Sequence, residues 1–260
     1  MVSDSFLSGT FGQWNFPRNL KVRQTGPSDA PRVMAFYASN PHPSYAPRDI
    51  THERVRDGHA LIVEDSAGSI WAASIDYEMA VELNSQGEVK NWSEIGTTRS
   101  ILNGCGIYQL INAVQALTIH FDYPPSEFIY LDIHESNEKA IGLMNKTLQW
   151  KDIQPCADLF SLSQGSLSEE KQGIPVKFFQ CTEENLTQMA RIILDVINAG
   201  GLTHKSGQSI EVDLSDLSLV HTHFDKLKEL AAKAAENDNP FDNAGVTEAS
   251  LLVHTCTADV

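Results

Sequence analysis

The residues best placed to do chemistry lie in a short glycine turn between a predicted strand and a predicted helix. The turn reads Asn103-Gly104-Cys105-Gly106, and Ile107 begins the helical pattern. The first N–H groups of a helix have no acceptor within it, and the helix dipole favours an anion at that end. Glycine has no Cβ, so a phosphate can come close to the main chain. We therefore expect backbone amides at this turn to bind a diphosphate.

Two common phosphate motifs are excluded at the turn, and a simpler explanation stays open. A P-loop needs a lysine followed by serine or threonine after the glycines, and the sequence has neither there. A dinucleotide fingerprint needs a third glycine where Gln109 stands. A tight turn that binds nothing also explains the pair of glycines.

An amide-based site suits the charge of the chain. The 260 residues carry 19 Lys and Arg against 34 Asp and Glu, a formal net charge of −15 at pH 7. Such a charge repels nucleic acids and anionic membranes, so we expect neither as a partner. The chain has no apolar run near the roughly 20 residues of a membrane helix, no secretory pattern and no C-x-x-C pair among its four cysteines. We expect a cytoplasmic protein with reduced thiols.

The elements that would position the turn alternate between strand and helix. Strands are predicted at 20–23, 59–64, 69–75, 89–98 and 128–133, with a hairpin turn at 65–68. Helices are predicted at 30–37, 107–121 and 137–144. Ser28 and Asp29 are expected to supply capping oxygens for the first helix. An antiparallel pair at 159–163 and 176–180 is expected to close the sheet.

The chain is predicted to divide after Cys181 into a first domain, 18–181, and a C-terminal extension, 182–260. The extension shows helical patterns at 183–198 and 224–237, and short strands are expected around 217–221 and 251–255. It lacks the pattern of a large core of its own, so we expect it to pack on the first domain. Its scattered histidines and Cys256 do not make a convincing ligand set, and we expect no metal.

The order of elements resembles that of the GNAT superfamily of N-acetyltransferases, over about residues 18–181. The segment 103–108 is similar to the pyrophosphate loop of that family, and 137–144 to its N-x-x-A-x-x-L-Y segment. Segments 20–29 and 148–151 resemble its opening strand and helix and its Gly-Phe-Lys string. The resemblance implies a mixed α/β (α+β) fold of the acyl-CoA N-acyltransferase type.

The resemblance further implies acetyl-CoA as co-substrate and transfer of an acyl group to a primary amine in one displacement. The cofactor would lie against a strand edge and the glycine loop. The residues expected to contact it are Ile95, Thr97, Thr98, Asn103, Gly104, Cys105, Gly106, Ile107, Tyr108 and Asn137. Asn137 would either bind the pantetheine arm or only cap its helix.

Three residues are candidates for proton transfer. Glu94 would be the general base, directly or through water, if burial raises its pKa; otherwise it is a solvated strand residue. His134 ends the fifth strand and would relay the proton of the amine, or only close the strand by hydrogen bonds. Tyr130 is one candidate to protonate the leaving thiolate.

The sequence departs from the family pattern at three positions. Asn103 replaces the usual Arg or Gln and removes a cation, and Tyr108 is large where the family has a small residue. Met144 stands where a tyrosine often protonates the thiolate. Tyr130, Tyr108 or Cys105 would then take that role, or the thiolate leaves unassisted.

The acidic surface would attract a cationic acceptor, such as a polyamine, an aminoglycoside or a lysine side chain. A homodimer is compatible with the sequence. Two other functions stay open: a non-catalytic acyl-CoA-binding or regulatory module, and a protein-interaction domain without cofactor. The first is favoured by Asn103 and Met144, and the second by the bulk of Tyr108.

Overall fold

The computed structural model describes residues 17–41, 51–82, 89–123, 128–153 and 175–237. Within these residues the strands form one mixed sheet of nine, in the order β6-β7-β5-β4-β3-β2-β1-β9-β8. The strands are β1 (Asn19–Gln24), β2 (Ala60–Asp65), β3 (Ile70–Glu82), β4 (Val89–Ser100), β5 (Phe128–His134), β6 (Lys151–Ile153), β7 (Val176–Cys181), β8 (Gly201–Thr203) and β9 (Ser209–Asp213).

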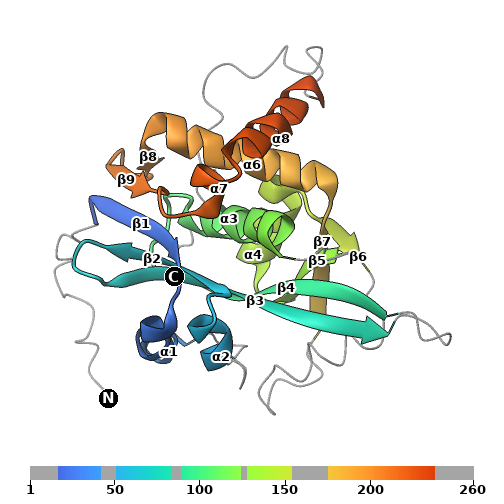
Figure 1. Cartoon of the computed structure of the whole chain (residues 1–260), viewed down its shortest axis with the longest axis horizontal. Coiled ribbons are helices and arrows are strands. Elements are labelled where there is room, and N and C mark those ends of the chain that lie inside the picture. Colours follow the sequence, from blue (N-terminus) through green and yellow to red (C-terminus); the bar gives the residue numbers. More distant parts are fainter. Residues whose placement is uncertain (1–16, 42–50, 83–88, 124–127, 154–174, 238–260) are drawn as a thin grey trace, which may run out of the picture.

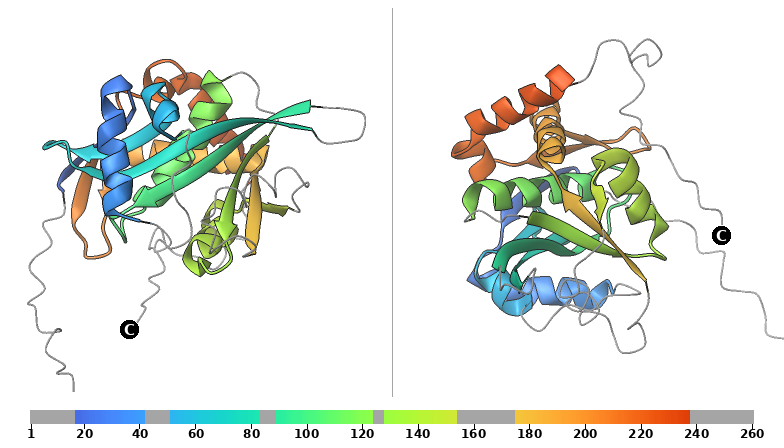
Figure 2. Two further views of the ribbon diagram at one scale, coloured as in Figure 1. Left: turned by 90° about the horizontal axis from the view of Figure 1, so that it is seen from below. Right: turned by 90° about the vertical axis from the view of Figure 1, so that its right-hand side faces the viewer.

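Helices cover both faces of this sheet (Figure 1). Helices α1 (Ala30–Ser39) and α2 (Thr51–Arg56) lie on one face. On the other lie α3 (Ile107–Asp122), α6 (Glu183–Ala199), α7 (Ser218–His221) and α8 (Phe224–Asn237). The chain also forms the short elements η1 (Pro27–Asp29), α4 (Glu138–Leu143) and η2 (Met144–Leu148). Figure 2 shows the same layers from two other sides.

Helix α3 is the centre of the larger core. The sequence predicted an amphipathic helix, but residues on nearly all of its sides are buried. The reason is that α3 lies between the sheet and α6, so both its faces are covered. Its start at Ile107 fixes the glycine turn directly against the core.

The C-terminal extension continues the sheet and packs on α3. Strand β9 pairs in parallel with β1, from Asn19 opposite Glu211 to Lys21 opposite Asp213. Helix α6 begins at a capping box formed by Thr182 and Asn185 and packs against α3, and α8 packs against α6. These contacts join residues after 182 to the sheet and to α3. The domain boundary at 181/182 stays a prediction.

Three expectations about local structure are corrected. Within the expected strand at 217–221, residues 218–221 form the helical turn α7, and the strands β8 and β9 were not predicted. Strand β7 is confirmed, but its partners are β5 and the unpredicted β6. The segments 159–163 and 251–255 lie outside the described residues.

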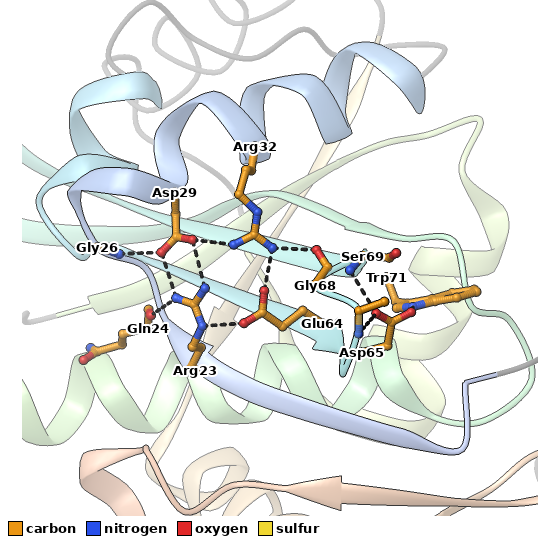
Figure 3. Close-up of polar contacts among 11 residues, drawn as sticks. Arg23, Gln24, Gly26, Asp29, Arg32, Glu64, Asp65, Gly68, Ser69 and Trp71 are labelled. Carbon is orange, nitrogen blue, oxygen red and sulfur yellow. Dashed lines mark hydrogen bonds and ion pairs between the residues drawn. The ribbon is translucent and has the colours of Figure 1, made fainter.

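Asp29 does not cap α1 as expected, because two arginines take its carboxylate (Figure 3). Arg23 of β1 donates to both carboxylate oxygens of Asp29, at 2.7 and 2.9 Å, and also to Glu64 of β2 at 2.7 Å. Arg32 of α1 bridges the same two acids, at 2.9 and 2.6 Å. The cluster therefore ties α1 to the first hairpin of the sheet.

These partners lower the pKa of Asp29. The hydrogen bond from Arg23 is the main cause, burial opposes it, and the pKa of Asp29 falls to about 2. The pKa of Glu64 is lowered as well, because hydrogen bonds from Arg23 and Arg32 outweigh the effect of its burial. A carboxyl group whose pKa is depressed by folding stabilises the fold above its unfolded pKa, and loses that contribution as the pH falls toward the folded value.

We expect Asp29→Asn to lower the free energy of unfolding by about 2 kcal/mol at pH 7, the amount that corresponds to the pKa shift of this 5% exposed side chain. The loss should shrink between about pH 4 and pH 2, since the wild-type carboxylate is protonated there. Urea unfolding at several pH values measures both effects. Asp57→Asn is the control, because Asp57 pairs with Arg56 on the surface; an equal loss in both variants would contradict the prediction.

Candidate functional site

The two central strands of the sheet part at their midpoint. Strands β4 and β5 are parallel neighbours at only three positions, from Trp92 opposite Phe128 to Glu94 opposite Tyr130. Beyond this point β4 continues to Ser100, paired with β3 alone. Within the described residues, β4 therefore has an open edge from Ile95 onward.

A bulge in β4 lies just past the point of parting. The register between β3 and β4 shifts there, and Thr97 has a φ of 52°, a left-handed value that is uncommon for a β-branched residue. Tyr37 of α1 donates to the carbonyl of Thr97 at 2.7 Å, and the Tyr77 hydroxyl lies 2.9 Å from its Oγ1. The Thr51 hydroxyl of α2 lies 2.8 Å from that of Tyr77. Both helices thus hold the bulge in place.

The hydroxyl and carbonyl of Thr97 are consequently engaged within the protein. The hydroxyl of Thr98 is also engaged, 2.9 Å from that of Ser74 and 3.3 Å from the Asn112 side chain. Both threonine hydroxyls therefore have partners within the protein. The contacts of Ile95, Thr97 and Thr98 with a cofactor stay a prediction.

Glu94 and Tyr130 meet at the point where the strands part. Glu94 is 3% exposed, which excludes the expectation of a solvated strand residue. Tyr130 donates to Glu94 Oε2 at 3.1 Å, so the structure brings these two predicted residues together. Both lie on the sheet face that α1 and α2 cover, because Glu94 folds over Gly96 beside Tyr77.

His134 lies farther along the same face. Four residues separate it from Tyr130, or roughly 13 Å along an extended strand, so it does not join the pair. Its ring is buried, and Ser136 N–H donates to its Nδ1 at 3.1 Å, so this nitrogen is the acceptor of a neutral ring. Asp132 lies between Tyr130 and His134, and strand alternation places it on the same face. The sequence analysis did not name Asp132, although its spacing of two residues from each of them predicts this position.

The glycine turn presents unpartnered backbone amides. Gly106 precedes α3 in the left-handed conformation, with a φ of 78°, and no side chain caps the helix. Within the part of the chain that the structure describes, no acceptor lies opposite the N–H groups of Gly106, Tyr108 and Gln109. These groups are what the sequence predicted as an anion site.

Cys105 of the turn is buried, and Tyr108 at the start of α3 is partly buried. Burial raises the pKa of the Cys105 thiol, although the Ile107 N–H bonds to it. Burial likewise raises the pKa of Tyr108 to about 12, against a hydrogen bond with Asn112.

Two further predicted positions have structural roles. Asn137 accepts a hydrogen bond from Ala140 N–H at 3.3 Å, so it caps α4, one of its two expected roles. Met144 is fully buried in the larger core, so its side chain packs within the protein.

The extension supplies contacts to the turn that the sequence analysis missed. His204 Nε2 lies 3.0 Å from the carbonyl of Asn103, and Lys205 N–H donates to the carbonyl of Gly104 at 2.8 Å. A Cβ on Gly104 would lie 2.9 Å from Lys205 Cδ. Gly104 therefore makes room for the extension, and not for a phosphate on that side as the sequence suggested.

The described residues contain no group of three or more His, Cys, Asp or Glu that could hold a metal, and none of their helices is long and apolar enough to cross a membrane. Of the histidines and the cysteine of the extension that the sequence analysis considered, His254 and Cys256 lie outside the described residues. His223 pairs with Asp122 at 2.8 Å.

Comparisons with known proteins find likeness at the level of solved structures. No family model and no curated protein matches the chain. NAA60 of Arabidopsis thaliana, solved with acetyl-CoA, is 13% identical, with a TM-score of 0.46 over 62% of this chain and 97% of that one. The diaminobutyrate acetyltransferase EctA of Paenibacillus lautus is 12% identical, with a TM-score of 0.40 over 62% and 93%. A GNAT-family acetyltransferase of Streptococcus pneumoniae is 16% identical, with a TM-score of 0.43 over 62% and 98%.

These similarities are low, and the fold is assigned from the order and pairing of the elements. The order strand, helices, hairpin, strand, glycine turn, long helix, strand, short helix and closing strands is the one that carried the resemblance. The chain has a mixed α/β fold, which confirms the mixed sheet and helices that the sequence predicted, while the acyl-CoA N-acyltransferase type of that fold stays a prediction.

The close approach of Glu94 to Gly96 gives a test of this geometry. A Cβ at position 96 would lie 2.7 Å from Glu94 Oε1 and 2.8 Å from the Tyr77 ring. Gly96→Ala should therefore lower the free energy of unfolding by about 1–3 kcal/mol, as overpacking does. Gly142→Ala on α4 is the matched control, since nothing lies within 4 Å and alanine favours a helix there. Chemical unfolding measures both, and equal stability would contradict the geometry.

Proposed function

We propose that this protein is an N-acyltransferase that moves an acetyl or related acyl group from a coenzyme A thioester to a primary amine. The observation that carries the proposal is the open edge of β4, which runs from unpartnered amides at α3 to the buried Glu94–Tyr130 pair. One end of this path suits an anion, and the other holds a carboxylate that can accept a proton.

The residues present fit the diphosphate of coenzyme A. The N–H groups at the start of α3 and the left-handed Gly106 form a backbone cradle that needs no side-chain cation. This suits a chain of charge −15, whose overall field disfavours anions. The donor would bring the activated acyl group, and the chain would bind and orient it.

The dimensions of the strand require an extended donor. Ile95 to Ser100 spans roughly 16 Å at about 3.3 Å per residue. A thioester held by its diphosphate at the glycine turn therefore reaches Glu94 only if its arm lies along β4. Backbone N–H and C=O groups of the open edge can pair with the two amide groups of that arm, as they would with a neighbouring strand.

Glu94 is the proposed general base. The amine nitrogen would form the new bond to the acyl carbon, the bond to sulfur would break, and Glu94 would take the amine proton directly or through water. Tyr130 directs its proton at Glu94, which orients the carboxylate. While that bond lasts, Tyr130 does not protonate the thiolate, so we propose that the thiolate leaves unassisted. His134 stays a proposed relay for the proton.

The acceptor is proposed to be a small molecule or peptide with a primary amine. The charge of −15 would favour the approach of a cationic one. We also propose a cytoplasmic location, because the sequence has no apolar run of membrane length and no C-x-x-C pair.

A non-catalytic acyl-CoA-binding module is the second candidate. The observation that favours it is the complete burial of Met144, because no side chain at that position can protonate a thiolate. Binding of coenzyme A without release of free thiol across a panel of amines would support the module over the enzyme.

Substitution of Gly106 tests the cradle. Gly106→Val should abolish binding of coenzyme A, because its side chain would stand beside the free amides. The left-handed backbone also makes valine cost about 1–2 kcal/mol of stability. Gly200→Val is the control, since Gly200 has a φ of 69° and open space around it. Calorimetry should show unchanged affinity in the control; similar affinity in both variants would remove the turn from the site.

Substitution of Glu94 tests the base. Glu94→Gln keeps the shape and should lower the rate of transfer roughly a hundredfold or more, with little change in the affinity for coenzyme A. Tyr130→Phe removes the hydrogen bond to Glu94 and should cause a smaller loss of rate. Thiol release under saturating donor measures both rates. Full activity of Glu94→Gln would assign the proton transfer to another group.

A further inference from the structure

The turn between β8 and β9 lies directly on the glycine turn. It belongs to the extension, outside the segment that resembles the GNAT superfamily, and 101 residues separate His204 from Asn103. Lys205 N–H donates to the Gly104 carbonyl at 2.8 Å, and Leu202 Cδ2 lies 3.9 Å from where a Cβ of Gly106 would be. The two turns are thus in contact at Asn103 and Gly104, and Leu202 of β8 lies close to Gly106.

His204 is built into this contact as a donor. It is 6% exposed, and Ser206 N–H donates to its Nδ1 at 3.1 Å, so Nδ1 is the acceptor of the ring. The proton of the neutral ring is then on Nε2, which donates to the carbonyl of Asn103 at 3.0 Å. The β8–β9 turn thus holds the carbonyls of Asn103 and Gly104, and the N–H groups at the start of α3 stay available to a ligand.

Lys205 brings a positive charge to the same place. Its methylene groups cover Gly104, where a Cβ would lie 2.9 Å from Cδ and 3.1 Å from Cγ. Lys205 is exposed, and within the described residues it forms no ion pair. Its ammonium group is therefore carried by a stem that packs over Gly104, two residues before the left-handed Gly106 that precedes α3.

We propose that the β8–β9 turn completes the diphosphate site: Lys205 supplies the cation that binds the phosphates, and His204 is a positioning residue that holds the glycine turn. This inference rests on the proposed function. It accounts for Asn103, which in this sequence replaces the cationic or amide side chain of the resembled loop. The charge then comes from the extension.

The test measures the affinity for coenzyme A by calorimetry at low and high salt, in the full chain. Lys205→Met keeps the stem and removes the charge, so it should weaken binding roughly five- to tenfold at low salt, the effect of one partly exposed charged contact. The difference should shrink at high salt, because ions screen it. Lys228→Met on α8 changes the net charge equally, and its affinity should match the wild type.

A second pair of variants tests the positioning role. His204→Leu removes the donor to Asn103 and should weaken binding, whereas His204→Gln offers an N–H in its place and should restore most of the affinity. Thermal unfolding of both variants separates this effect from loss of the fold. A purely structural histidine would give no such rescue.

The outcomes distinguish the two proposals. If the wild type binds coenzyme A and Lys205→Met binds equally well at both salt concentrations, the role of the β8–β9 turn is wrong and the proposed function stands. If the wild type does not bind coenzyme A, the proposed function fails and this inference fails with it.

Discussion

The site depends on one constraint, the separation of β4 from β5 after Glu94. Parallel strands would ordinarily continue to pair and satisfy each other's backbone groups. The bulge at Thr97 interrupts this, and its left-handed backbone costs of the order of 1–3 kcal/mol. Hydrogen bonds from Tyr37 and Tyr77 offset that cost and connect the bulge to α1 and α2. The helices on that face of the sheet therefore support the bulge through these two tyrosines.

A second constraint is the negative charge of the chain, which limits how an anion can be held. Backbone dipoles at α3 act over a short range and are fixed by the fold, so the net charge does not remove them. Under the proposal above, Lys205 would add a positive charge locally, and its position above Gly104 needs the glycine that the sequence analysis had assigned to the ligand. Gly104 thus allows a contact within the protein, and Gly106 provides the left-handed residue before α3.

The sequence was most informative where the hydrophobic periodicity and the turn-forming residues predict the same boundaries. The hairpin of β2 and β3, helix α3 and the glycine turn follow from local patterns, and Glu94 and Tyr130 were named from their positions on strands. The role of Asp29 could not be read in this way, because it depends on Arg23 and Arg32 across a tertiary contact. Strands of three to five residues such as β8 and β9 are too short to show a clear pattern in the sequence. The contact of His204 with Asn103 joins residues 101 positions apart, so no local pattern could predict it.

The position of the extension in the sheet makes it part of the site's framework. Because β9 pairs with β1 and α6 packs on α3, the elements on both sides of the β8–β9 turn are held by elements from earlier in the chain. A turn held in this way can fix the carbonyls of Asn103 and Gly104 without losing much conformational entropy on each binding event. The same contacts mean that the extension cannot detach without disturbing the start of α3. Preorganisation of the amides by a segment remote in sequence is thus a direct consequence of the strand order.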